Sequence, residues 1–163
     1  MRRPLKIAGL ILAWALIVAQ FFQPEKNLNA GPQEHDIMGF LVVPDQVASL
    51  LKNSCYDCHS NNTPYPWYNK ISPVSWYLDK HVKDGKKALN FNEFGLLNQR
   101  KMIGTLSTVC EVIESGSMPL VSYTFIHRSA NLDEDEVNVL CDWAEAGAEH
   151  LMRAAAKPEN VEP

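Results

Sequence analysis

Two cysteines and a histidine within five residues are the side chains of this chain best placed to do chemistry together. The segment reads Cys55-Tyr56-Asp57-Cys58-His59, and the two thiols are separated by about one helical turn. At this C-x-x-C-H spacing, each thiol can add to a vinyl group of one haem, and the adjacent imidazole can bind the iron. The segment therefore predicts one covalently attached haem c, held by Cys55 and Cys58, with His59 as the proximal ligand.

A zinc site is the main alternative for the same three side chains. Structural zinc usually needs a second pair of ligands at similar spacing, and the other cysteines, Cys110 and Cys141, are isolated in the sequence. A thioredoxin-like redox pair would accompany a βαβ pattern, which this chain lacks. A disulfide between Cys55 and Cys58 would close a very small loop and stabilise little. Haem is favoured, and a zinc-binding structural module stays as an alternative.

A methionine further along the chain is the expected sixth iron ligand. Met118 lies between a glycine that ends a predicted helix and Pro119, and it follows His59 by 59 residues (118 − 59). That length allows the chain to pass from one face of a haem to the other. Methionine opposite histidine raises the reduction potential. His127, with the neighbouring Arg128, and His81 are the rival distal groups.

The first residues predict export from the cytoplasm. Arg2, Arg3 and Lys6 form a basic flank, and 7–22 contains no charged residue. Sixteen residues of helix span about 24 Å, somewhat less than a membrane core. We expect a single uncleaved membrane anchor over 1–23, with the positive flank in the cytoplasm. A cleaved signal peptide is the alternative.

The rest of the chain predicts a linker over 24–44, one helical domain over 45–153 and a disordered tail over 154–163. Apolar residues at helical spacing predict helices that begin at Asp45, Val74, Leu96 and Asp133. Gly85 is expected to end the second of these, and Glu136 to form an acidic capping box with Asp133. No segment has the pattern of a strand, so the fold class is all-α.

Composition and the remaining cysteines add two expectations. The net charge of −4 excludes the basic surface that a nucleic-acid partner would require. Cys110 and Cys141 could form a disulfide in an oxidising compartment. Both also lie on predicted apolar helix faces, where an unpaired cysteine packs as a small hydrophobic residue, and this second interpretation is favoured.

Several segments resemble the bacterial membrane-anchored haem-binding domain family, which is related to cytochrome c. The resemblance covers roughly residues 5–145 and rests on the following segments: 54–61, containing C-x-x-C-H; the aromatic stretches 66–68 and 73–76; 89–91; 111–113; Gly116; Met118-Pro119; and 142–144. It implies a small cytochrome c-like helical domain around one haem, with Cys55, Cys58, His59 and Met118 at the cofactor. Leu120 stands where the family often has a second proline.

The aromatic block after the haem motif has two interpretations. Trp67, Tyr68, Trp76 and Tyr77 could hydrogen-bond a haem propionate, but packing against the haem edge and the loop is favoured. A main-chain carbonyl of Pro64, Pro66 or Pro73 is expected to accept the Nδ1–H of His59.

The expected function is one-electron transfer rather than catalysis. A filled sixth position at Met118 suits a carrier tethered to the bacterial inner membrane, with its haem domain in the periplasm and redox proteins as partners. An open-site sensor or a peroxidase-like enzyme is the alternative, with His127 and Arg128 as its distal acid–base pair.

Overall fold

The computed structural model describes residues 2–29 and 31–156. Within these ranges every regular element is helical, and the only strand-like feature is an isolated bridge between Leu28 and Asn62. The predicted all-α fold class is confirmed for this part of the chain. The elements are α1 (Arg2–Ala19), α2 (Ile37–Phe40), α3 (Asp45–Ser54), α4 (Tyr56–His59), η1 (Trp67–Lys70), α5 (Val74–Ala88), η2 (Phe91–Leu96), α6 (Gln99–Glu114), α7 (Val121–Thr124), η3 (Arg128–Ala130) and α8 (Glu134–Ala156).

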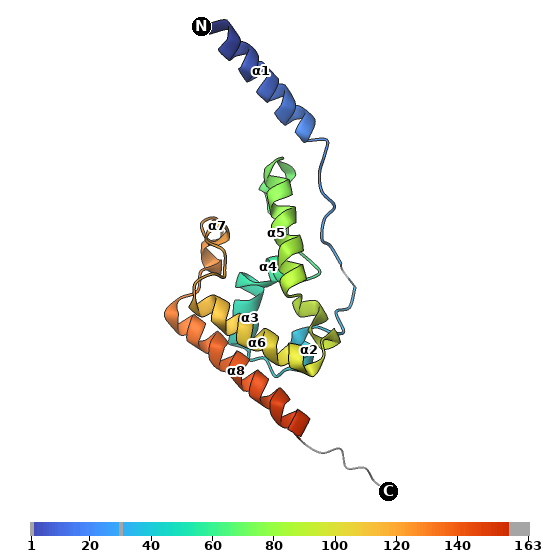
Figure 1. The fold of residues 1–163 in the computed structure, drawn as a ribbon, viewed down its shortest axis with the longest axis vertical. Helices are drawn as coiled ribbons and strands as arrows, with labels where there is room; N and C mark the ends of the chain where they lie inside the picture. Colours follow the sequence, from blue (N-terminus) through green and yellow to red (C-terminus); the bar gives the residue numbers. More distant parts are fainter. Residues whose placement is uncertain (1, 30, 157–163) are drawn as a thin grey trace.

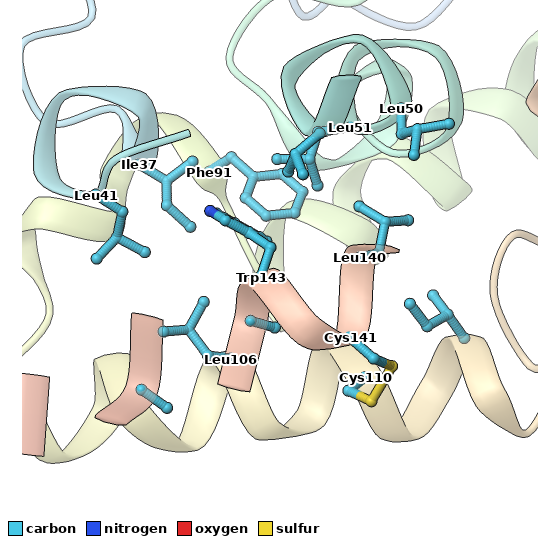
Figure 2. Packing of buried hydrophobic residues seen from close by; sticks show 14 of the residues in the cluster. Ile37, Leu41, Leu50, Leu51, Phe91, Leu106, Cys110, Leu140, Cys141 and Trp143 are labelled. Carbon is cyan, nitrogen blue, oxygen red and sulfur yellow. A yellow bond between two sulfur atoms is a disulfide. The ribbon is translucent and has the colours of Figure 1, made fainter. Parts of the chain in front are cut away.

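The core lies where α6 and α8 pack along each other and against α3 (Figure 1). Leu106 from α6, Leu140 from α8 and Leu51 from α3 are almost completely buried. Figure 2 shows these side chains around Phe91 and Trp143. The indole Nε1–H of Trp143 donates to the carbonyl of Val42 at 3.1 Å, which satisfies the polar atom of a buried aromatic side chain.

A disulfide joins the two longest helices of this core. Cys110 on α6 and Cys141 on α8 are bonded to each other (Figure 2). The favoured expectation of two unpaired cysteines was therefore wrong. Both residues do lie on apolar helix faces, as predicted, but the two faces pack on each other and bring the sulfur atoms together.

The helix boundaries agree with the sequence patterns except at two places. Helix α6 begins at Gln99 rather than at the predicted Leu96, which belongs to η2, and the end of α5 also differs. Asp133 and Glu136 form the expected capping box, with reciprocal backbone-to-carboxylate bonds of 3.0 and 2.9 Å. Gly85 does not end α5, which continues to Ala88. A Cβ at position 85 would lie 2.9 Å from the carbonyl oxygen of Cys58. The glycine is there because α5 crosses the backbone of α4 at this point, not because the helix stops.

Helix α1 projects away from the other helices (Figure 1). Its 18 residues include three basic ones, Arg2, Arg3 and Lys6. Among the described residues, no helix combines the length and the apolar character needed to cross a membrane. The predicted membrane-spanning anchor over 1–23 is therefore not supported.

The segment after α1 is attached to the domain. Gln20 donates through Nε2 to the carbonyl of Ser72 at 3.0 Å, and the indole of Trp76 donates to the carbonyl of Phe22 at 2.6 Å. Within 24–44, the stretch predicted as a linker, α2 places Ile37 in the core with no exposed surface. Helix α8 reaches Ala156, and the rest of the predicted tail, 157–163, lies outside the described residues.

Candidate haem site

The C-x-x-C-H segment forms a tight turn at the end of α3. Cys55 is the junction between α3 and α4, and its N–H still donates to the carbonyl of Leu51 at 2.9 Å. The carbonyl of Cys55 accepts from Cys58 N–H at 3.2 Å and from His59 N–H at 3.0 Å. Both cysteines are free thiols and half-buried. One turn of backbone therefore carries both thiols and the imidazole.

His59 is oriented by a main-chain carbonyl. Its Nδ1 lies 3.0 Å from the carbonyl oxygen of Leu89, just after α5. Because a carbonyl can only accept, Nδ1 carries the proton and Nε2 is left as the ligand atom. The expected acceptors, the carbonyls of Pro64, Pro66 or Pro73, were wrong. A main-chain carbonyl does fix the orientation of the imidazole, as expected, but it belongs to the backbone that follows α5.

Burial keeps the site residues in their neutral forms. Burial lowers the pKa of His59, and hydrogen bonds to backbone carbonyls oppose this only in part. Burial, with a smaller contribution from Cys58, raises the pKa of the Cys55 thiol to about 12. Burial and the neighbouring Asp57 raise the pKa of the Cys58 thiol to about 11. A neutral imidazole is the form that binds a metal.

Two adjoining cavities border the motif. The larger has a volume of about 660 Å³ and lies between the end of α5, η2 and α6. The smaller, about 350 Å³, lies between α4, α5 and the loop before α7. Both volumes fall in the usual range for small-molecule sites. The cavities share five lining residues, namely Cys55, His59, Ala88, Ile113 and Met118.

Met118 lies in the loop that leaves α6. The helix ends at Glu114, and Gly116 reverses the chain with a φ of 67°, a conformation that favours glycine. The N–H of Met118 then donates to the carbonyl of Val112 at 3.0 Å. This returns the chain toward α6 and leaves the methionine partly buried at both cavities. The structure thus brings Met118 to the same cavities as His59.

The rival distal groups differ in their positions. His127 and Arg128 line neither cavity, and His127 Nε2 lies 2.6 Å from the hydroxyl of Tyr68. His81 does border the smaller cavity, with its Nδ1 2.8 Å from the carbonyl of Tyr77. The four aromatic residues considered for a propionate contact or for packing on the haem edge line neither of the two cavities; they are Trp67, Tyr68, Trp76 and Tyr77.

A polar pair between α4 and α7 was not expected from the sequence. Tyr123 donates its hydroxyl to Asp57 Oδ2 at 2.7 Å, and its ring stacks on His127 with centroids 4.5 Å apart. Burial raises the pKa of Asp57, while the bond from Tyr123 and the nearby His127 act against it. Burial and the hydrogen bond to Asp57 raise the pKa of Tyr123. No sequence motif marks such a pair, because its members are 66 residues apart.

The geometry does not favour zinc. Within the described ranges, Cys55, Cys58 and His59 do not converge into a three-ligand cluster. The cluster that does form is Cys110, Glu114 and Cys141, and the sulfur atoms of its two cysteines are bonded to each other. The C-x-x-C-H side chains instead face cavities, as attachment to a large planar cofactor requires.

The fold and the site define a small helical protein with a cofactor cavity between its helices. The model of a haem-binding domain family matches residues 14–146, so the chain belongs to this family of haem-binding domains. No curated protein and no solved structure matches the chain.

Proposed function

We propose that this chain is a monohaem c-type protein, cytochrome c-like, which carries single electrons between other redox proteins. Cys55 and Cys58 would hold the haem through thioether bonds, and His59 and Met118 would bind its iron. The observation that carries the proposal is that His59 and Met118 border the same two cavities. When bound, such a haem supplies one-electron chemistry at a potential that methionine ligation raises.

The residues around the cavities support a carrier more than an enzyme. A peroxidase requires a distal acid–base group in reach of the bound substrate, and the expected pair, His127 and Arg128, lies outside both cavities. Leu89 fixes the imidazole of His59 by a 3.0 Å bond, and a fixed ligand reduces the rearrangement that accompanies a change of iron charge.

We also propose that the haem domain works outside the cytoplasm, in the bacterial periplasm, where its partners would be other redox proteins. The support is the disulfide between Cys110 and Cys141, because disulfides persist in oxidising compartments and are rare in the cytosol. Fusion to a reporter active only in the periplasm tests this directly, with activity expected. A reporter that is active only in the cytoplasm would refute it.

The first experiment is co-expression with haem-maturation enzymes, followed by a denaturing gel stained for haem and a pyridine haemochrome spectrum. We expect haem to stay on the chain and to show a c-type spectrum. Cys55→Ser with Cys58→Ser should remove it from the denatured chain. Haem that stays on the denatured double variant, or no haem on the wild-type chain, would refute covalent attachment at Cys55 and Cys58.

The sixth ligand is tested by Met118→Leu. The native oxidised protein should show a far-red methionine–iron band that this variant loses, and ferrous Met118→Leu should bind carbon monoxide readily. Met102→Leu is the matched control, because Met102 is a buried core methionine that lines neither cavity. Carbon monoxide binding by the native wild-type protein would favour an open-site sensor or enzyme, with His81 as the nearest candidate distal group.

A further inference from the structure

The larger cavity carries an excess of positive charge in a chain of net charge −4. Its basic lining residues are Lys86, Lys87 and Lys101, and its acidic one is Glu93. The residues described as lining it therefore sum to +2 (3 − 1) in an acidic protein. Such an arrangement favours an anionic ligand group at the cavity.

Lys87 and Lys101 approach the cavity from two different helices. Lys87 is in the last turn of α5, and Lys101 is in the first turn of α6. Asn98 caps α6 by accepting the N–H of Lys101 at 3.0 Å. The positive end of the α6 dipole lies at the same place and adds to the charge of the lysine. Both lysines line the cavity and are exposed to solvent.

The amino groups of these lysines are not engaged by carboxylates. On the same helix α5, Lys80 and Lys83 form ion pairs with Asp84 and Asp79. Across the described residues, neither Lys87 nor Lys101 has an ion pair of this kind. Lys86 is already held, since its Nζ donates to Asn27 Oδ1 at 2.7 Å. Among the described contacts, Lys87 and Lys101 are therefore the two cavity lysines whose amino groups have neither an ion pair nor a hydrogen bond within the protein.

We propose that Lys87 and Lys101 bind the two propionate carboxylates of the haem. This inference rests on the proposed function, because thioether bonds at Cys55 and Cys58 fix the vinyl side of the macrocycle. The propionates are on the opposite side of the macrocycle, and the larger cavity is lined both by Cys55 and by these two exposed lysines. Ammonium-to-carboxylate hydrogen bonds are among the strong ones in proteins. The aromatic residues that could have taken this role, Trp67, Tyr68, Trp76 and Tyr77, line neither cavity.

The test compares haemin with haemin dimethyl ester, in which both propionates are neutral, by titration of the haem-free wild-type chain. We expect haemin to bind at least tenfold more tightly than the ester. The double variant Lys87→Gln, Lys101→Gln should lose about tenfold in haemin affinity and keep its affinity for the ester. Lys83→Gln, on the same helix but outside both cavities, should change neither.

The outcomes separate this inference from the proposed function. Equal affinity of the wild type for haemin and the ester, or an equal loss of both in the double variant, would overturn the lysine assignment while leaving haem binding intact. A wild-type chain that binds neither compound would overturn the proposed function as well. In the covalently loaded protein, the double variant should also have a lower midpoint potential, because removal of nearby positive charge favours the ferric state; an unchanged potential would count against the assignment.

Discussion

The hydroxyl of Tyr123 donates to Asp57 Oδ2 at 2.7 Å, which ties α7 to the turn between Cys55 and Cys58. The ring of Tyr123 stacks on His127, and His127 Nε2 lies 2.6 Å from the hydroxyl of Tyr68. These contacts hold the segment that follows Met118. The loop around Met118, which would be the distal loop of the proposed haem site, is therefore fastened to the C-x-x-C-H segment by side-chain contacts.

Tyr123→Phe should loosen the distal loop. The variant leaves the half-buried carboxylate of Asp57 without its tyrosine donor, which costs about 1–3 kcal/mol in unfolding free energy. We also expect a weaker far-red methionine–iron band in the oxidised, haem-loaded protein, because Met118 precedes α7. Urea unfolding and the visible spectrum measure the two effects.

Tyr77→Phe is the matched control for this prediction. Its hydroxyl also reaches α7, at Ser122 Oγ over 3.2 Å, but that bond is exposed. Loss of an exposed hydrogen bond should change stability by less than about 0.5 kcal/mol. Equal effects of the two substitutions would show that the Asp57 bond has no special role in holding the loop.

The thiols of the haem-free chain should react slowly with iodoacetamide. The pKa is raised to about 12 for Cys55 and about 11 for Cys58, and only the thiolate reacts. Alkylation rates should therefore keep rising about tenfold for each pH unit between pH 7 and 10. Raised thiol pKa values also mean that the folded state binds these protons more tightly than the unfolded state. Its stability should fall as the pH rises above the ordinary thiol pKa of 9.0.

Mass spectrometry of the labelled chain measures these rates, and the urea-unfolded chain is the control. In urea the rate should level off near the ordinary thiol pKa. Levelling at the same pH in the folded chain would contradict the buried environment of Cys55 and Cys58.

The Cys110–Cys141 disulfide should stabilise the packing of α6 on α8. The two cysteines are 31 residues apart, and loop-closure entropy for a loop of this size corresponds to about 3–4 kcal/mol. Replacing both cysteines with alanine should lower the urea midpoint of the haem-loaded protein accordingly. Reduction of the wild type under the same conditions should have a similar effect. An unchanged midpoint, or four free thiols in the purified haem-free chain, would contradict the bond.

The sequence predicted the helices better than their contacts. The starts of α3 and α8 follow from apolar spacing and from the capping box of Asp133 with Glu136, which are local signals. The predicted end of α5 was wrong because a glycine can mark either a helix stop or a close helix crossing. Only the close approach of Cys58 to Gly85 shows that this glycine marks a crossing. The pairing of Cys110 with Cys141 was missed for a similar reason, since a buried free thiol and a half-cystine have the same apolar pattern.

The sequence predicts the residues of the candidate site whose side-chain type carries the chemistry. It does not predict the contacts made by the main chain. Cys55, Cys58, His59 and Met118 are predicted from their residue types, and the structure places His59 and Met118 at shared cavities. The acceptor for His59 was missed because a main-chain carbonyl such as that of Leu89 has no signature in the sequence. Its position depends on how α5 crosses α4.

A bulky residue at position 104 should block haem without unfolding the chain. Gly104 is on α6 and lines the larger cavity, and a Cβ there would have no protein atom within 4 Å. Gly104→Leu therefore adds volume to the cavity, and leucine favours a helix over glycine by up to about 1 kcal/mol. We expect far-UV circular dichroism of the haem-free chain to be unchanged and haem incorporation to fall at least tenfold.

Ser107→Leu is the control, because Ser107 is an exposed residue of the same helix outside both cavities. Normal haem loading of Gly104→Leu would show that the cofactor does not occupy the space between α6 and the end of α5.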